Sequence, residues 1–548
     1  MRQESRARRP RPAIRNVALI LCAVAGLAVA CAGRETSAPS ADRTFRFRIR
    51  EDPPTLDPAR AIDQLSEAVL FGLFRGLVEM EPATMTVRPA VAASWTVSDD
   101  RLTYTFRLRD DVFFHNGRQL TARDVAWSYR RLLSPATGSP RRSILEPLAG
   151  AAAFVAGTTS ELPGLQTPDD RTVVIRLAKP FAPFLSALTL VNTAILPAEV
   201  YEDAGEGYLR APVGCGPFRF VRWEQSNFIE LAAFDRFYGG RPEIDRVRVR
   251  IIENRQSALQ EYLAGGLDSL DEVPEDEDPI AVTLKDEIHR YPFIGTQFIG
   301  FNHALAPFKG NAALRKAFNH AVDKEYFHRT LHGEPMANGI IPPGAPAHDP
   351  SLPGYPYDPE KAKRLLAEAG YPGGRGLPPI TLWYNTSEDM QQSMQKIQAD
   401  LKQVGVDLRL KSVDWAAYLA AVEGTRDRPG EAQMYRFGWY LDYPDAESIL
   451  RPLLYSSNAG PAGNYSRYAN PRVDALIDEA MGLVDDAARV QRYREAQRIA
   501  VMDDAVWLFL SYAQSKTLFK PYVKGIVTTP LGEFRIPIDR LRLEKGPA

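Results

Sequence analysis

The chain has 548 residues, a formal charge of −1, 25% charged residues and three cysteines. Without residues 1–30, which hold six arginines and one glutamate, the formal charge is −6. A mildly acidic body argues against nucleic acid and anionic lipid as partners. The remaining 518 residues exceed what one hydrophobic core holds, so we expect two or three lobes. Cys215 is the only cysteine after Cys31, so we expect no disulfide within the body.

The N-terminal segment predicts export. An arginine-rich start is followed by Val17 to Ala30, 14 residues without a charge. A transmembrane helix needs about 20 apolar residues, so this run is typical of a signal peptide over residues 1–30. Ala28-Val29-Ala30-Cys31 resembles a bacterial lipoprotein cleavage site, which predicts lipidation of Cys31 and a flexible tether over residues 31–43. The alternative is ordinary cleavage after Ala30. Either way we expect the protein on the periplasmic or cell-surface side of the membrane.

The first half of the body reads as strand-rich. Residues 44–50, 102–108, 172–177 and 245–252 alternate between apolar and polar side chains, the pattern of half-buried strands. Residues 121–133 read as a short helix, because Thr121 can cap it and Asp124 favours its first turn.

The second half alternates helices and strands. A helix is expected from Asp358-Pro359 to Gly370, a strand at 380–384, a helix at 390–404 and a strand at 406–413. This order predicts a parallel pair of strands joined by a helix. Helices at 471–484 and 487–503 follow. The strand-like stretch 517–527 finds partners only if the chain returns to the first lobe.

Patterns that could carry chemistry are weak. His328 and His332 are four residues apart, but no third ligand is spaced to complete a metal site. Gly214-Cys215-Gly216 leads into a strand rather than a helix, which favours a tight turn over a dinucleotide loop, and Cys215 reads as a small buried residue. We therefore expect no catalytic residue, no cofactor and no metal.

The stretch from Ala90 to Tyr129 carries the strongest signal. It closely resembles the sequence hallmark of the peptide/nickel class, family 5, of solute-binding proteins of ABC importers. The matching parts are Ser94-Trp95, Asp99-Asp100, Tyr104-Thr105-Phe106, Leu108-Arg109, Phe114-His115-Asn116-Gly117 and Thr121-Ala122-x-Asp124-Val125. Read physically, this is a hairpin, a turn and a capped helix, so we expect these residues to be structural.

Other motifs follow in the family's order and extend the resemblance over residues 44–545. They are Pro54 to Pro58, Pro212 to Phe218 with Cys215 where threonine is more usual, Arg315 to Asp323, which resembles the family's interlobe helix, and Asn464 to Ala480. The resemblance implies an α/β, periplasmic-binding-protein-like fold of two lobes, with an extra domain in the larger lobe. The implied domains are domain I (44–75, 190–290 and 515–548), domain II (76–189) and domain III (291–514).

The segment Phe437 to Tyr443 is similar to the pocket of the oligopeptide- and dipeptide-binding branch of this family. The resemblance implies that Asp442 pairs with the α-ammonium of a bound peptide and that Trp439 forms a pocket wall. It also implies that Arg436 attracts the peptide carboxylate, a match that suits a guanidinium's paired donors. Trp415 resembles a further pocket tryptophan. On the residues alone, a surface loop is the favoured place for Asp442, Arg436 could equally lie on the surface, and Trp415 could equally belong to the core.

These expectations define one function and two alternatives. The resemblance implies a monomeric binding protein that closes on a short peptide and delivers it to a membrane permease driven by a cytoplasmic ATPase. The alternatives are the same fold with a non-peptide cargo, such as an oligosaccharide or a metal chelate, and a hydrolase or scaffold on this fold. Fold alone does not decide between cargoes.

Overall fold

The computed structural model describes residues 43–544, except 204–206, 209, 272, 274–278, 331–333, 387, 425–427, 461–462 and 484. The signal segment, Cys31 and His332 therefore lie outside the described residues. Residues Thr44–Glu544 cluster as one unit, so the boundaries between domains I, II and III stay a prediction.

The first sheet is built from strands distant in sequence. β1 (Thr44–Ile49) pairs in parallel with β10 (Arg246–Ile251), which pairs antiparallel with β9 (Phe228–Ala233), followed by β8 (Phe218–Glu224). The alternation expected for 44–50 and 245–252 is confirmed as strands β1 and β10. α2 (Gln64–Leu73) shares a hydrophobic core with this sheet, and its cap is Asp63, whose carboxylate accepts from the Ser66 amide at 2.8 Å.

The second sheet belongs to the stretch that resembles the family hallmark. Its strand order is β4 (Ala92–Val97), β5 (Thr103–Leu108), β7 (Thr172–Arg176) and β6 (Leu165–Asp169), and the hairpin β2 (Val78–Glu81) and β3 (Thr86–Pro89) lies beside it. α3 (Ala122–Leu133) packs into the same core. The expected hairpin and capped helix are therefore present.

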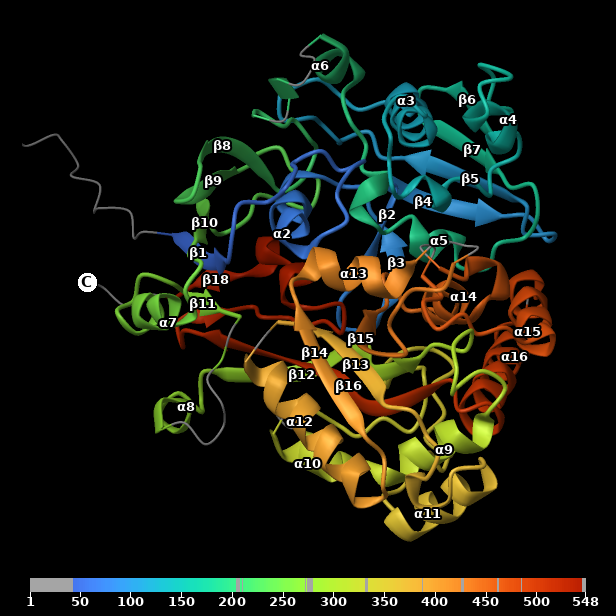
Figure 1. Ribbon diagram of the computed structural model, residues 1–548. Helices are drawn as coiled ribbons and strands as arrows, with labels where there is room; N and C mark the ends of the chain where they lie inside the picture. Colours follow the sequence, from blue (N-terminus) through green and yellow to red (C-terminus); the bar gives the residue numbers. More distant parts are fainter. Residues whose placement is uncertain are drawn as a thin grey trace, which may run out of the picture. The chain divides into compact units, whose positions relative to one another are not determined.

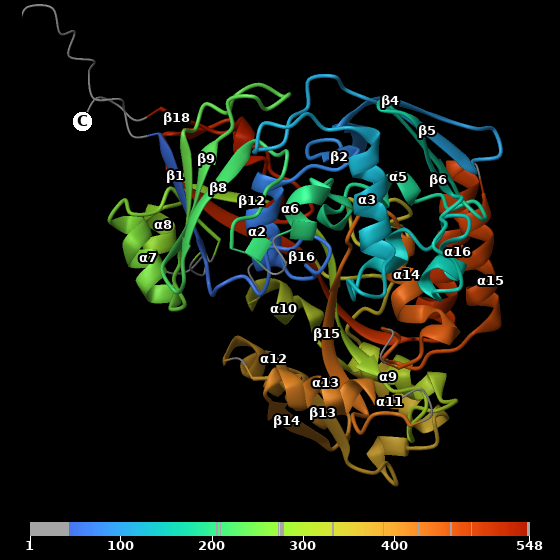
Figure 2. The ribbon, with the colours of Figure 1, turned by 90° about the horizontal axis from the view of Figure 1, so that it is seen from above.

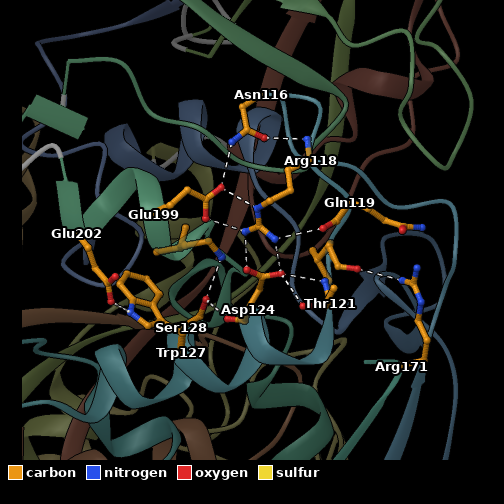
Figure 3. A network of polar contacts seen from close by, with 12 residues as sticks. Asn116, Arg118, Gln119, Thr121, Asp124, Trp127, Ser128, Arg171, Glu199 and Glu202 are labelled. Atoms are coloured by element: carbon orange, nitrogen blue, oxygen red, sulfur yellow. Dashed lines mark hydrogen bonds and ion pairs between the residues drawn. The ribbon is translucent and has the colours of Figure 1, made fainter. Parts of the chain in front are cut away.

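Figure 3 shows the polar network that holds this stretch in place. The Arg118 guanidinium donates to both carboxylate oxygens of Asp124, at 2.6 and 3.0 Å, and to both oxygens of Glu199, at 2.7 and 2.9 Å. Asp124 also accepts from the Thr121 amide at 2.8 Å and so caps α3. Since Glu199 belongs to α6 (Ala198–Asp203), these charges link two helices and serve the fold.

The third sheet has six strands and dominates the second half. Its order is β11 (Ser269–Leu270), β16 (Trp507–Phe519), β12 (Ile288–Phe301), β15 (Met434–Tyr440), β13 (Ile380–Asn385) and β14 (Leu408–Val413). The parallel pair β13 and β14, joined by α12 (Glu388–Gln403), confirms the predicted strand–helix–strand unit.

Helices cover both faces of this sheet, as Figure 1 shows. One core holds α9 (Ala312–Ala321), α11 (Pro359–Glu368) and α12, and the other holds α13 (Trp415–Glu423), α14 (Glu447–Leu454), α15 (Pro471–Gly482) and α16 (Asp486–Arg498). α9 contains the motif that resembles an interlobe helix, but it packs on α11 and β16 within the third sheet's own layer. Buried Leu314 and Phe318 place α9 in this core, and its assignment as an interlobe helix stays a prediction.

The long strands β12 and β16 continue beyond the helices toward the first sheet, where the end of β16 pairs with β11. The Asp268 amide, next to β11, donates to the Arg46 carbonyl of β1 at 2.7 Å. The chain therefore does return to its first half near residue 517, and Figure 2 shows β16 and β12 close to β1 and α2. Beyond it, β17 (Val523–Lys524) pairs with β18 (Arg542–Leu543).

The remaining elements are short. They are η1 (Arg142–Ile144), α4 (Ala151–Val155), α5 (Phe184–Ala187), η2 (Val191–Thr193), α7 (Arg255–Leu263), α8 (Pro279–Thr283), α10 (Lys324–Thr330), η4 (Pro372–Gly374), η5 (Ser456–Asn458), the π-turn η6 (Ile499–Asp503), η7 (Glu533–Arg535) and η8 (Ile538–Arg540). The helix expected at 487–503 thus ends as an α-helix at Arg498 and closes with the π-turn.

Candidate functional site

Asp442 lies directly after β15, and its carboxylate faces a cation from a distant part of the chain. Nη1 and Nη2 of Arg141 lie 2.9 and 3.1 Å from Oδ2 and Oδ1 of Asp442. The two side chains are 30% and 28% exposed, so this bidentate, charge-assisted pair is largely withdrawn from water. Burial of the Arg141 guanidinium opposes its charge, yet the pKa of Arg141 is raised because Asp442 faces it.

The segment around Asp442 receives a second arginine. Arg535 donates to the Asp442 carbonyl oxygen at 3.4 Å, and the same guanidinium binds Glu67 of α2 at 3.0 and 3.2 Å. The neighbouring Tyr443 is buried in the core of the second sheet. Residues 442 and 443 therefore join the third sheet to α2, to the C-terminal stretch and to the segment that carries Arg141.

Trp439 is fixed beside Asp442 through the first turn of α14. Its indole N–H donates to the Ser448 carbonyl oxygen at 2.8 Å, and the Asp442 amide donates to the Ser448 hydroxyl at 3.0 Å. The Trp439 ring is partly buried against the core beneath it. The structure thus brings together two of the four predicted residues, with Ser448 between them.

The Arg436 side chain lies on the face of β15 opposite to that of Trp439, because side chains three positions apart on a strand point to opposite faces. Its Nη2 donates to Gln297 Oε1 at 2.5 Å, and Gln297 Nε2 donates to the Tyr440 hydroxyl at 2.9 Å. Gly438 makes room for this pair, since a Cβ there would lie 2.3 Å from Gln297 Oε1. Arg436 therefore belongs to a polar group of its own, separate from the contacts of Asp442.

Trp415 is the first residue of α13 and is 53% exposed, so it does not belong to the core. Its ring stacks on Tyr418 with centroids 5.3 Å apart, and the Tyr418 hydroxyl donates to the Arg436 carbonyl oxygen. Trp415 is thereby linked to Arg436 and presents an aromatic face to solvent.

A half-buried carboxylate, Glu334, also lies within the electrostatic influence of Arg436. Glu334 accepts from the Ser511 hydroxyl at 2.5 Å, and the charges of Arg436 and Lys516 act on it. His328 lies on the same segment, with Nδ1 2.8 Å from the Glu334 carbonyl oxygen. Burial raises the pKa of Glu334 from 4.5 to about 7.

This shift predicts a pH-dependent stability. Between pH 4.5 and about 7 the native carboxyl keeps its proton while the unfolded one has lost it. The contribution of Glu334 to the free energy of unfolding therefore falls as pH rises through this window and is constant above it. Glu334→Gln, which is neutral at every pH, is expected to raise the melting temperature at pH 8 and leave it unchanged at pH 4, measured by scanning calorimetry. Equal melting temperatures at pH 8 would contradict the assignment.

The described residues contain no group of three or more His, Cys, Asp or Glu side chains that could hold a metal ion. Within the same part of the chain, no helix is long and apolar enough to span a membrane. Cys215 is 1% exposed, and burial raises the pKa of its thiol to about 12, as suits a small packed residue.

A cavity of about 120 Å³ lies elsewhere, between β1, α2, the β2–β3 hairpin and residues 529–541. None of the four predicted residues is among the described residues that line it, although Arg535 is. Its arginines are neutralised by acids, for example Arg75 by Glu79 at 3.1 Å and Arg540 by Glu81 at 2.9 Å. We therefore place the candidate site at Asp442 rather than in this cavity.

Sequence reasoning missed the partners of the predicted residues. Arg141 lies 301 residues from Asp442, and Gln297 lies 139 residues from Arg436. Pro140-Arg141-Arg142 reads as an ordinary polar loop, so no local pattern marks Arg141. Only the fold brings these side chains together.

Comparisons with known proteins agree with the resemblance noted in the sequence. The model of the bacterial extracellular solute-binding proteins, family 5 (middle), matches residues 86–461. Heme-binding protein A of Haemophilus influenzae is 32% identical over 520 residues, covering 90% of this chain and 91% of its own. Glutathione-binding protein GsiB of Salmonella typhimurium is 30% identical over 460 residues, covering 83% and 86%.

A solved structure supports the same assignment. Haemophilus influenzae OppA in complex with RPPGFSPFR superimposes with a TM-score of 0.75 at 25% identity, covering 93% of this chain and 100% of its own. The fold and these comparisons define an extracytoplasmic solute-binding protein of mixed α/β architecture, with the binding-protein fold expected from the sequence. The chain belongs to family 5 of the bacterial extracellular solute-binding proteins.

Proposed function

We propose that the protein captures short peptides outside the cytoplasmic membrane, with the peptide's α-ammonium at Asp442, and delivers them to the permease of an ABC importer. The observation that carries the proposal is the setting of Asp442, a largely buried carboxylate that already binds a cation from across the fold. Such a carboxylate favours a cationic ligand group, because the attraction between the two charges offsets the cost of removing both from water. The peptide bound to OppA supports a peptide cargo.

The rest of the site suits the remainder of a peptide. Trp439 offers an apolar wall beside Asp442, and exposed Trp415 and Tyr440 offer aromatic faces near Arg436. The Arg436–Gln297 pair supplies polar partners, with Arg436 as a candidate for the peptide carboxylate. The protein binds and releases its cargo as a monomer, without a cofactor and without catalysis.

Closure on the cargo would use the predicted domains I, II and III. β1, β10, β9 and β8 lie within the ranges of domain I, and β4 to β7 lie within domain II. Only β12 and β16 cross the boundaries near residues 290 and 514, so we infer that these two strands carry the hinge.

A metal chelate is the second candidate cargo, because one relative is named a heme-binding protein. The two candidates differ at Asp442, since a cargo without an ammonium would leave the Asp442–Arg141 pair intact. Native mass spectrometry of freshly purified protein tests the proposal, because a closed binding protein retains its cargo. We expect masses of short peptides. A retained porphyrin or sugar would contradict the peptide assignment.

We further propose that Cys31, outside the described residues, carries a lipid anchor. Cys31→Ser is expected to move the protein from the membrane fraction to the soluble extracytoplasmic fraction, measured by fractionation and immunoblotting. Cys215→Ser is the matched control, because its thiol is buried in the fold and should not affect fractionation. Membrane association that survives in Cys31→Ser would contradict the anchor.

A further inference from the structure

The outer face of the first sheet is rich in arginine. Phe45, Val247 and Leu231 point into the core that this sheet shares with α2, so their neighbours along each strand point to the opposite face. This arginine face is formed by side chains from β1, β8 and β10, namely Arg46, Arg219, Arg222, Arg246, Arg248 and Arg250. The side chains of Arg222 and Arg246 are 57% and 51% exposed, and Figure 1 shows their strands at the edge of the ribbon.

One glutamate serves three of these arginines. Glu230 of β9 is 4% exposed. Its carboxylate lies 2.5 Å from Arg246, 2.7 Å from Arg248 and 3.9 Å from Arg222. The arginine stems cover apolar surface, since the guanidinium carbons of Arg222 and Arg248 lie 4.7 and 4.9 Å from the centroid of the Phe228 ring. A buried carboxylate is balanced by one cation, so this cluster keeps two further positive charges.

The other acids on and beside this face do not cancel its charge. Asp268 lies 3.6 Å from Arg46, and Glu261 lies 3.3 Å from Arg250. Glu224, at the end of β8, accepts from Asn227. With Glu230 these make four acids against six arginines, which gives the arginine face a formal charge of +2. The body as a whole carries −6, which argues against an anionic partner, but attraction to a charged surface depends on the local field.

The place of this face along the chain indicates which surface it meets. β1 is the first strand of the body, and the proposed lipid anchor at Cys31 precedes Thr44 by 13 residues. A segment of that length spans at most about 45 Å when it is fully extended. An anchored body therefore keeps the first sheet close to the bilayer. An anionic leaflet attracts each basic residue near its surface by about 1 kcal/mol, over a range of about 8 Å.

We propose that the arginine face docks on the anionic headgroups of the membrane that holds the anchor. The inference goes beyond cargo capture and rests on the proposed lipidation of Cys31. Because the anchor makes the encounter intramolecular, a weak attraction is enough to orient the body. The same headgroups repel the acidic remainder of the surface, so the charges select one orientation of the anchored protein.

The orientation of the lipidated protein in vesicles tests the inference. A fluorophore is attached to Val221→Cys, an exposed position beside Arg222, or to Gly482→Cys, an exposed position on α15, which Figures 1 and 2 both show far from β8. Buried Cys215 does not compete for the label. With phosphatidylglycerol vesicles that contain a headgroup quencher, we expect stronger quenching at position 221 than at 482. The difference should vanish in pure phosphatidylcholine and at high salt.

Charge variants identify the residues responsible. Arg222→Gln combined with Arg246→Gln removes the charge of +2, and we expect the ratio of docked to undocked protein to fall about 30-fold. The matched control is Arg472→Gln combined with Arg492→Gln, because these exposed arginines of α15 and α16 change the net charge of the protein equally. It should dock as the wild type does. Thermal melting confirms that both proteins are folded.

Four results would overturn the inference. Two are equal quenching at positions 221 and 482 in anionic vesicles, and a preference for 221 that survives in Arg222→Gln/Arg246→Gln. A preference seen only in vesicles that contain the permease would assign the arginine face to the permease instead. An intact mass without a lipid at Cys31 would remove the anchor and the docking together. Peptide capture at Asp442 would stand in every case, because it is measured separately by titration calorimetry.

Discussion

Asp442→Asn is expected to weaken binding of a peptide with a free amine by about 30-fold, as for removing one partner of a largely buried charge pair. This loss of affinity lies at the lower end of the usual range for such pairs, because 28% of the Asp442 side chain is exposed. The asparagine keeps the size of the side chain and the Ser448 contact of the backbone, so the loss reports charge rather than packing. Titration calorimetry with one tripeptide and its N-acetylated form measures it.

The acetylated peptide provides the internal check. It should bind the wild type as weakly as the free peptide binds Asp442→Asn, and the variant should not distinguish the two forms. Asp486→Asn is the matched control, because Asp486 is an exposed aspartate at the start of α16. Unchanged affinity in Asp442→Asn for both peptides would remove Asp442 from the site.

Gly214→Ala is expected to lower the free energy of unfolding by about 3 kcal/mol or more, the upper range for forcing extra volume into a packed core. A Cβ at Gly214 would lie 2.1 Å from the Leu73 carbonyl oxygen, at the end of α2. The nearest atom belongs to the backbone, the next is Cδ1 of the Phe74 ring at 2.6 Å, and the Gly216 amide donates to the same Leu73 oxygen at 2.9 Å. To make room for the added methyl group, the turn at residues 214–216 and the end of α2 must therefore move apart. Denaturant unfolding monitored by circular dichroism measures the effect.

Gly482→Ala serves as the control for this substitution. Gly482 is the last residue of α15, and a Cβ there meets no atom within 4 Å. Alanine favours a helix over glycine by up to about 1 kcal/mol, so this variant should be as stable as the wild type or slightly more stable. A Gly214→Ala protein of wild-type stability would show that the glycine turn does not pack on α2 as described.

The sequence predicted well those elements whose pattern is local. β1 and β10 alternate apolar and charged residues, and α3 and α11 carry their own caps, so both kinds could be located without the fold. β12 could not, because its last eight residues are all buried and show no alternation. The pairing of β12 with β16 joins segments about 200 residues apart, which no periodicity reveals.

For the candidate site, the sequence pointed to residues in and after β15 but not to their partners from other segments. The family resemblance pointed to residues of β15 and the segment after it, since these are contiguous in the chain. It gave no partner for Asp442, because Arg141 and Arg535 come from two other segments of the chain. It also grouped Arg436 with Trp439, whereas strand alternation puts these two side chains on opposite faces of β15 and Arg436 donates to Gln297.

A crystal structure of the protein with its retained cargo would show directly whether the cargo's ammonium binds the carboxylate of Asp442. We predict an ammonium nitrogen within about 3 Å of an Asp442 oxygen, with the direct contact from Arg141 to Asp442 broken. A cargo bound elsewhere, with both Arg141–Asp442 hydrogen bonds intact at 2.9 and 3.1 Å, would contradict the claim.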